Sequence, residues 1–196
     1  NIYKGKVSRI EPSLGAAFVN YGAERHGFLP FKEISPQFYP EKHNRNSRLS
    51  VSDCLKKDQE ILVQVEKDER GNKGAALTTN ISLAGRYLVL MPNNPKAAGI
   101  SRRLEGKERD KLKERIASLN VPESMGLIVR TAGEGKDLED LKWDLEYLQR
   151  VWEGISEANT LKNSPILIFK ESDIIIRALR DYLKEDIEEI LSLIHI

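Results

Sequence analysis

The sequence predicts an α+β protein in which a small barrel of five β-strands is followed by a region that mixes helices and strands. In the first 80 residues, short segments of alternating apolar and polar residues recur, separated by turns. After residue 100 the apolar residues are spaced three and four apart, which is typical of helices that bury one face. Because the two periodicities follow one another along the chain, we expect two structural units.

Five segments of the first half have the pattern of barrel strands. These strands are expected at residues 2–10, 16–21, 27–31, 60–68 and 75–79. Glycine-containing turns, such as "GNKG" at residues 71–74, separate them. Many short strands linked by tight turns favour a small barrel. Residues 35–54 contain Pro36 and Pro40 and little periodicity, so we expect a long, mobile surface loop there.

The second half alternates helices and short strands. A helix is expected over residues 102–120, a strand over 125–131, a long helix from residue 138, a strand over 165–169 and a last helix over 174–190. The long helix carries leucines, Trp152 and Ile155 at spacings of three and four. Ser172 or Asp173 is expected to cap the last helix. Together these elements predict a βαβα-like second domain.

The two ends of the sequence point to a piece of a longer protein. There is no initiator Met, and strand-like sequence begins at Ile2, so we expect the chain to start inside a longer one. Residues 191–196, "LSLIHI", break the charge pattern of the last helix. We expect these six residues to be a non-native tail.

The charge of the chain is distributed unevenly. The formal net charge is +1, but residues 1–132 carry a net +8 and residues 133–196 a net −7. The basic part is suited to a polyanion. Cys54 is the single cysteine, which excludes an internal disulfide and a cysteine-built zinc site within this sequence. No apolar run is long enough to cross a bilayer and no secretory signal opens the chain, so we expect a cytoplasmic protein.

Two phenylalanines in the predicted barrel are candidates for stacking on nucleic-acid bases. Phe18 and Phe28 each lie in mid-strand beside small residues, and on adjacent strands they form one aromatic platform. Tyr21 and His26 are expected near its edge. Five basic residues are expected around it: Lys4, Lys6, Arg9, Arg25 and Lys73. Strand periodicity alone places such rings in a barrel core somewhat more often than on its face, so both interpretations stay open.

The stretch "GLIVRTAG", residues 126–133, is the second candidate site. Arg130 offers a planar fork of N–H donors and Thr131 a hydroxyl, a combination that suits a phosphate, and the small residues that follow leave space for a nucleotide. From residue types alone, a surface charge or an ion pair is the commoner role for such an arginine.

No catalytic constellation is evident. Two acidic sets are expected to be solvated helix faces: Asp137, Asp140 and Asp144, and Asp181, Glu185 and Glu188. The histidines, His26, His43 and His195, have no companions at metal-ligand spacing.

Several unusual strings resemble a known family. Residues 3–34, "YKGKVSRIEPSLGAAFVNYGAERHGFLPFKEI", resemble the S-one-type RNA-binding OB-fold. A more specific resemblance, to the N-terminal half of proteins of the RNase E/G family, extends over residues 1–190. It is carried by three strings: "PSLGAAFVNYGAERHGFLP", "ERGNKGAALTT" and "SLAGRYLVLMPNNP". The resemblance implies a five-stranded S-one-type OB-fold domain at residues 1–80, a small α/β 5′-sensor subdomain at 81–173 and the start of an RNase-H-like subdomain at 174–190.

The resemblance also implies roles for particular residues. Phe18, Phe28 and Lys73 match positions that contact RNA in that family. Arg130 and Thr131, with the backbone at Val89, match positions that bind the 5′-monophosphate of the RNA. To these we add four expected RNA contacts: Tyr21, Lys6, Arg102 and Arg103.

The implied parent protein is an endoribonuclease that hydrolyses single-stranded RNA in mRNA decay and in rRNA and tRNA processing. The family's catalytic aspartates, which hold Mg²⁺, and its zinc-binding cysteine pair match no part of this sequence, so we expect no cofactor here and no cleavage by these 196 residues alone. The parent is expected to be a homotetramer in an RNA-decay complex, peripheral at the inner membrane. The strings favour the E type over the G type, and a stand-alone S-one-type RNA-binding protein is the alternative from another class.

Overall fold

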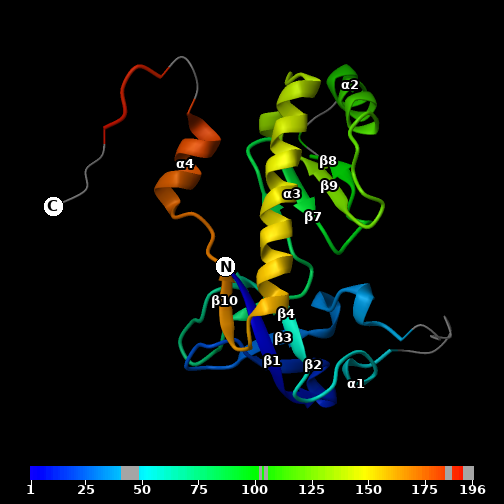
Figure 1. Cartoon of the computed structure of the whole chain (residues 1–196), viewed down its shortest axis with the longest axis vertical. Coiled ribbons are helices and arrows are strands. Elements are labelled where there is room, and N and C mark those ends of the chain that lie inside the picture. The colour runs from blue at the N-terminus through cyan, green and yellow to red at the C-terminus, as the bar shows by residue number, and fades with distance from the viewer. Residues whose placement is uncertain (41–48, 102, 104–105, 184–186, 192–196) are drawn as a thin grey trace.

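The computed structural model describes residues 1–40, 49–101, 103, 106–183 and 187–191. A β-barrel lies at one end of the molecule, and a four-stranded sheet with helix α2 (Gly106–Ala117) lies at the other (Figure 1). The long helix α3 (Leu138–Leu161) runs along the sheet, and its C-terminal end reaches the barrel.

The barrel closes as the strand pattern predicts. Its strands are β1 (Ile2–Glu11), β2 (Ala16–Asn20), β3 (Gly27–Pro30), β4 (Glu60–Lys67) and β5 (Ala76–Thr78). They pair in the order β1-β2-β3-β5-β4, and β4 pairs back with β1. Only β3 and β5 run parallel. The five-stranded barrel of the prediction is confirmed.

Alternation along the strands decides which side chains fill the barrel. Ala17 and Val19 of β2 are fully buried, whereas Phe18 between them is half-buried. Leu77 of β5 packs so closely on β3 that a Cβ at Gly27 would lie 2.4 Å from it. The barrel interior is thus filled by apolar side chains at every second position.

Strand β10 (Ile166–Phe169) departs from the expected arrangement. It pairs antiparallel with residues 2–4 of β1 and extends the barrel sheet, instead of joining the second sheet. The first residues of β1 are free to take this partner because β2 pairs only with the later part, residues 6–11. The prediction of a βαβα-like second domain that includes this strand is therefore wrong.

The second sheet contains strands that the sequence patterns did not reveal. Its order is β6 (Leu83–Ala84), β7 (Leu88–Met91), β9 (Gly126–Val129) and β8 (Gly99–Ile100), and of these only β9 was expected. Strands β6 and β8 have two residues each, which is too few to display a periodicity. Helix α3 packs on β7 through the leucine stripe that the sequence predicts, with Leu141, Leu145 and Leu148 buried.

Both flanking helices are shorter than expected. Helix α2 (Gly106–Ala117) begins at a glycine with a φ of 63° and ends before the expected residue 120. Helix α4 (Ile174–Tyr182) is capped by Asp173, as expected, but it ends eight residues before the predicted residue 190. Its apolar residues are largely exposed; Ile174 has 73% of its surface exposed.

The expected surface loop at residues 35–54 is anchored at both described ends. Residues 41–48 lie outside the described residues. Ser35 is fully buried and donates a hydrogen bond to the carbonyl of Asn93 at 3.0 Å. On the other side, the short helix α1 (Val51–Cys54) buries Val51 in the barrel core. The ends of the segment are thus anchored through Ser35 and Val51, while most of their other residues lie at the surface, and its mobility stays a prediction.

Candidate nucleic-acid interface

The two phenylalanines form the expected aromatic platform on the outside of the barrel. Phe18 of β2 lies directly opposite Phe28 of β3, and both rings are half-buried. The ring centroids are 5.8 Å apart in an edge-to-face arrangement with an interplanar angle of 67°. Because adjacent strands hold the rings in register, the platform is preformed. A role in RNA stacking stays a prediction.

Positive charge lies directly on this platform. The Arg9 guanidinium sits over the Phe18 ring, 4.8 Å from its centroid, which is within cation–π range. A groove of about 630 Å³ runs beside the ring and is also lined by Arg25, His26 and Asn72. The Arg9 side chain is 65% exposed. It can therefore move away from the Phe18 ring when a base stacks there, or it can stay in place while a base stacks on the opposite face of its guanidinium.

Lys73 lies in a tight hairpin turn close to the groove. The backbones of Arg70 and Lys73 bond to each other in both directions, at 3.2 and 3.1 Å, and Gly71 adopts a φ of 58° that favours glycine. The Lys73 side chain is exposed, and its neighbours Asn72 and Gly74 line the groove. The turn therefore lies next to the groove, and a contact of the Lys73 ammonium group with RNA stays a prediction.

Tyr21 is not part of the platform. Only 5% of its surface is exposed, and its ring packs edge-to-face on Tyr3 at 5.1 Å. The hydroxyl donates a hydrogen bond to Glu69 at 2.8 Å, and burial together with this carboxylate raises the pKa of Tyr21. The expectation that the Tyr21 ring lies at the edge of the stacking face is wrong, because the ring is a core residue.

The lysines of β1 have different surroundings. Lys6 is exposed and its ammonium lies 3.3 Å from Asp58, so it is available at the surface. Lys4 is only 9% exposed and does not ring the platform as expected. Its Nζ donates to the carbonyls of Asn159 and Lys162 at 3.0 and 2.8 Å, which ties the end of α3 to the barrel.

Arg130 is held by a carboxylate from α4. It follows β9 directly, and its two terminal nitrogens donate to the two oxygens of Asp181 at 2.9 and 2.8 Å. The Arg130 guanidinium lowers the pKa of Asp181 to about 2, and the carboxylate raises the pKa of Arg130. Asp181 was expected to be solvated, which is wrong. A phosphate that binds Arg130 must therefore share the guanidinium with Asp181 or displace it.

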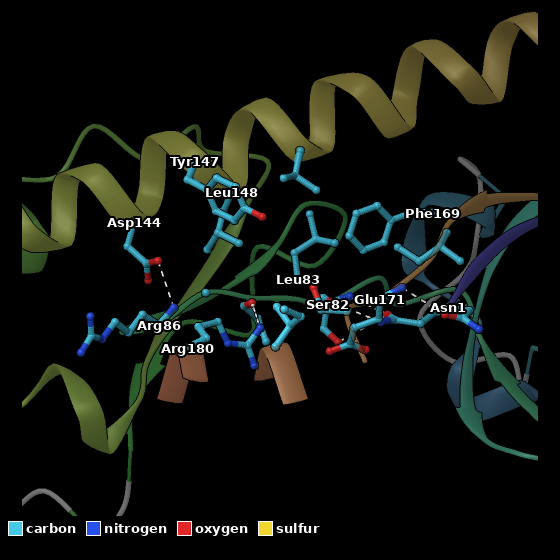
Figure 2. A pocket seen from close by; sticks show the side chains of 17 residues that line it. Asn1, Ser82, Leu83, Arg86, Asp144, Tyr147, Leu148, Phe169, Glu171 and Arg180 are labelled. Carbon is cyan, nitrogen blue, oxygen red and sulfur yellow. Dashed lines mark hydrogen bonds between the residues drawn. The ribbon is translucent and has the colours of Figure 1, made fainter. Parts of the chain in front are cut away.

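Asp144 positions the turn against which Arg130 packs. This residue of α3 accepts three backbone hydrogen bonds, from Arg86 at 3.0 Å and from Tyr87 and Leu88 at 2.8 Å each. Figure 2 shows the bond from Arg86. In turn, the Arg130 guanidinium donates a hydrogen bond to the carbonyl of Gly85. The backbone N–H of Arg130 donates a second hydrogen bond, to the carbonyl of Tyr87, at 2.8 Å.

The sequence contains a signal for Asp144 that the prediction of a solvated face missed. Asp144 lies three residues after Leu141 and four before Leu148, inside the buried leucine stripe of α3. A carboxylate on an apolar stripe needs buried partners, and here the turn after β6 supplies them. The same turn needs its glycine, because a Cβ at Gly85 would lie 2.5 Å from the Asp144 carboxylate.

Thr131 lies beside Arg130 on the wall of an open concavity. It begins a 3₁₀ turn (Thr131–Gly133) and is exposed. The concavity has a volume of about 1180 Å³, and its lining includes Thr131, Tyr87 and Asp181. Two cations face the Tyr87 ring, Arg86 at 5.4 Å and Lys136 at 5.3 Å from its centroid. The concavity thus offers space beside Thr131, where Arg86 and Lys136 contribute positive charge and Glu134, Asp140 and Asp181 contribute negative charge.

Three further predicted residues lie away from this concavity or outside the described residues. Val89 lies within β7, opposite Ile128 of β9, and does not line the concavity. Arg102 lies outside the described residues. Arg103 is exposed in the turn before α2, where its backbone N–H donates to the Ser101 hydroxyl at 3.4 Å.

Within the described part of the chain, no cluster of three or more histidine, cysteine or carboxylate side chains is arranged to hold a metal ion. No helix in that part combines the length and the apolar character that crossing a membrane requires.

Comparison with known proteins assigns both halves of the chain. The S1 RNA binding domain matches residues 1–80, and the Ribonuclease E/G family matches residues 82–192. Ribonuclease E of Escherichia coli strain K12 is 61% identical over 191 residues, which is 97% of this chain and 18% of that protein. Ribonuclease E of Haemophilus influenzae is also 61% identical, with 97% of this chain and 20% of that protein covered.

Ribonuclease G of Salmonella typhimurium is a more distant relative, 38% identical over 194 residues, with 97% of this chain and 39% of that protein covered. The chain thus spans about a fifth of the length of the ribonuclease E relatives named above. The barrel carries an aromatic platform and matches the S1 RNA binding domain. The family model matches the region that follows, which is more than half of the sequence. The chain therefore belongs to the ribonuclease E/G family.

Proposed function

We propose that this chain is the RNA-binding and 5′-end-sensing portion of a ribonuclease E-type endoribonuclease. The observation that carries the proposal is the preformed Phe18–Phe28 platform, with Arg9 over it, in a barrel that matches an RNA-binding domain. Bases of single-stranded RNA stack on such rings whatever their sequence, and nearby cations attract the phosphates. The identity of 61% to ribonuclease E, against 38% to ribonuclease G, favours the E type.

The second part of the proposal is a pocket for the 5′-monophosphate at Arg130 and Thr131. The concavity beside Thr131 supplies room, and Arg86 and Lys136 supply further positive charge. Arg130 is oriented by the Gly85 carbonyl and retains 27% side-chain exposure while paired with Asp181. A phosphate dianion carries more charge than a carboxylate monoanion, so it attracts the guanidinium more strongly and can compete with Asp181 for Arg130.

The parent protein is proposed to hydrolyse single-stranded RNA in mRNA decay and in rRNA and tRNA processing. Its Mg²⁺-binding aspartates and its structural zinc site are assigned to segments other than this one, and these 196 residues are expected to bind RNA without cleaving it. The parent is further proposed to be a cytoplasmic homotetramer within an RNA-decay complex at the inner membrane. These statements rest on family membership.

The test is the affinity for oligoribonucleotides that differ only at the 5′ end. Single-stranded RNA with a 3′ fluorophore and a 5′-monophosphate, 5′-hydroxyl or 5′-triphosphate is titrated with the chain by fluorescence anisotropy. We expect the monophosphate to bind about tenfold more tightly than the hydroxyl form, the size of one or two charge-assisted hydrogen bonds. The triphosphate is expected to lose this advantage because it is bulkier and more highly charged.

Two variants assign the preference to Arg130. Arg130→Ala combined with Asp181→Asn removes the guanidinium without leaving an unpaired carboxylate, and it is expected to abolish the preference while the 5′-hydroxyl RNA binds as before. Arg150→Ala, which removes an exposed arginine of α3, serves as the matched control. Equal affinities of the unmodified chain for all three ends contradict 5′ sensing, and failure to bind any of them contradicts the whole proposal.

A further inference from the structure

A β-bulge lies directly beside the aromatic platform. The pairing of β1 with β2 shifts register between Val7 and Arg9, so that Ser8 has no partner residue on β2. The Ser8 hydroxyl instead donates a hydrogen bond to the Phe18 carbonyl at 3.0 Å. Bulges redirect side chains and are frequent next to functional sites. Here the bulge brings a hydroxyl to the rim of the groove that Phe18 lines.

The Ser8 hydroxyl determines which nitrogen of His26 carries the proton. The oxygen of Ser8 lies 2.9 Å from Nδ1 of His26. A serine hydroxyl has one hydrogen, and Ser8 gives it to the Phe18 carbonyl, so Nδ1 must supply the hydrogen of the second bond. In the neutral ring this fixes the Nδ1–H tautomer and leaves Nε2 as a hydrogen-bond acceptor.

The backbone of His26 is closely packed at the groove, and its side chain is exposed. Arg25 donates a hydrogen bond to the Gly71 carbonyl, which ties the two turns together. Gly74 approaches so closely that a Cβ there would lie 2.2 Å from the His26 carbonyl. Nε2 of His26 has no hydrogen-bond partner among the described residues, and the imidazole lines the same groove as Phe18 and Arg9. An accessible acceptor thus lies in the groove beside the position of a nucleotide stacked on Phe18.

We propose that Nε2 of His26 accepts a hydrogen bond from the nucleotide that stacks on Phe18. Two donors of a nucleotide meet this requirement, the ribose 2′-hydroxyl and an N–H of the base edge. A phosphate has no hydrogen to give near neutral pH, and its contacts in this groove belong to Arg9 and Arg25. The inference rests on RNA binding by the barrel face and is independent of the 5′-end pocket.

The first experiment measures the tautomer directly. In the chain labelled with ¹⁵N-histidine, the two ring nitrogens of each tautomer have distinct shifts at pH 8, and the loss of one signal set in His26→Gln identifies His26 among the three histidines. We expect the Nδ1–H form in the unmodified chain and in Ser8→Thr, and a shift towards the Nε2–H form in Ser8→Ala. An Nε2–H ring in the unmodified chain overturns the inference.

The second experiment measures binding of 5′-hydroxyl oligonucleotides by the unmodified chain and by His26→Phe, which keeps a ring but has no acceptor. Oligouridine is compared with its 2′-deoxy form and with its N3-methyl form, which lacks the ring N–H. We expect His26→Phe to bind oligouridine about threefold to tenfold more weakly, the size of one neutral hydrogen bond. For whichever modified oligonucleotide lacks the donor that His26 uses, the two proteins are expected to bind equally.

Each outcome has a definite meaning. If the unmodified chain and His26→Phe bind the 2′-deoxy form equally, the contact is to the ribose. If they bind the N3-methyl form equally, the contact is to the base. Equal binding of all three by the two proteins, or an equal loss for all three, overturns the inference. So does an affinity that depends on His26 only below pH 6, because that result identifies an imidazolium–phosphate contact. Absence of RNA binding by the unmodified chain contradicts the proposed function instead.

Discussion

The barrel face and the Arg130 pocket are both candidate RNA contacts, but they are built in different ways. Phe18 and Phe28 are fixed by strand alternation and by register between neighbouring strands. Arg130 is oriented by groups from three distant elements, namely the turn after β6, Asp144 of α3 and Asp181 of α4. The platform is therefore available whether or not those elements are docked, whereas the phosphate pocket depends on tertiary contacts.

The largest expected effect is on the platform. Phe18→Ala with Phe28→Ala removes both stacking surfaces, and because each stacked base contributes about 1–3 kcal/mol, RNA affinity is expected to fall at least about tenfold for every 5′ end. Anisotropy titrations measure the loss. Phe31→Leu is the control, since Phe31 stacks on Tyr39 away from this groove, at 6.0 Å. A loss confined to the 5′-monophosphate form contradicts the independence of the two regions.

A smaller effect, confined to the other region, is expected from Asp144→Ala. The three backbone N–H groups of residues 86–88 lose their acceptor, at a cost on the order of 2–3 kcal/mol in the free energy of unfolding. The 5′-monophosphate preference is expected to disappear while 5′-hydroxyl RNA binds normally. Denaturant unfolding and the end-group titration measure the two effects, and Glu146→Ala, at an exposed position of the same helix, is the control. Retention of the preference contradicts the positioning role.

Next in size is the release of Arg130 from its carboxylate. Asp181→Asn removes the negative charge beside the proposed phosphate site, so 5′-monophosphate RNA is expected to bind about threefold to tenfold more tightly at low salt, and less so at high salt. Glu139→Gln on α3 is the control, because it removes one negative charge, as Asp181→Asn does, but at a different position. An increase of the same size for 5′-hydroxyl RNA shows a general charge effect and removes Asp181 from the pocket.

The Asp181 pair also predicts how stability depends on pH. The pKa of Asp181 is lowered to about 2 by Arg130, so its contribution to stability is complete above the ordinary aspartate pKa of about 3.9 and is lost as the pH falls towards 2. Thermal unfolding of the chain and of Asp181→Asn, measured between pH 2 and pH 7, is expected to differ most near neutrality and to converge in acid. A constant difference contradicts the ion pair.

The smallest effect is expected at Lys73. Lys73→Ala removes one surface cation, so RNA affinity is expected to fall only about twofold to threefold at moderate salt, and the salt dependence is expected to decrease by about 0.7 in the slope of log K against log salt. Titrations at several salt concentrations measure the slope. Lys142→Ala on α3 is the control, and an unchanged slope in Lys73→Ala excludes a phosphate contact at this turn.

Prediction from sequence was most complete where structure is local. The five barrel strands, the leucine stripe of α3 and the Asp173 cap were all anticipated, because periodicity and capping depend on neighbouring residues. Strands β6 and β8 are too short to show a period, and β10 took a partner that no pattern in its own residues specifies. Tyr21 was predicted at the platform because it lies near Phe18 in sequence. Its actual contacts, the Tyr3 ring and the Glu69 carboxylate, come from other parts of the barrel and draw it into the core.

The sequence by itself determined the barrel strands, because alternation gives each strand one inward and one outward face. It left open which face carries Phe18 and Phe28, and the structure places both on the outside. Only the tertiary structure decided the partners of the charged groups. Arg130 meets a carboxylate 51 residues away, and Asp144 meets backbone groups up to 58 residues away. Such pairs form because a half-buried charge requires a partner, and which partner arrives depends on how the helices dock.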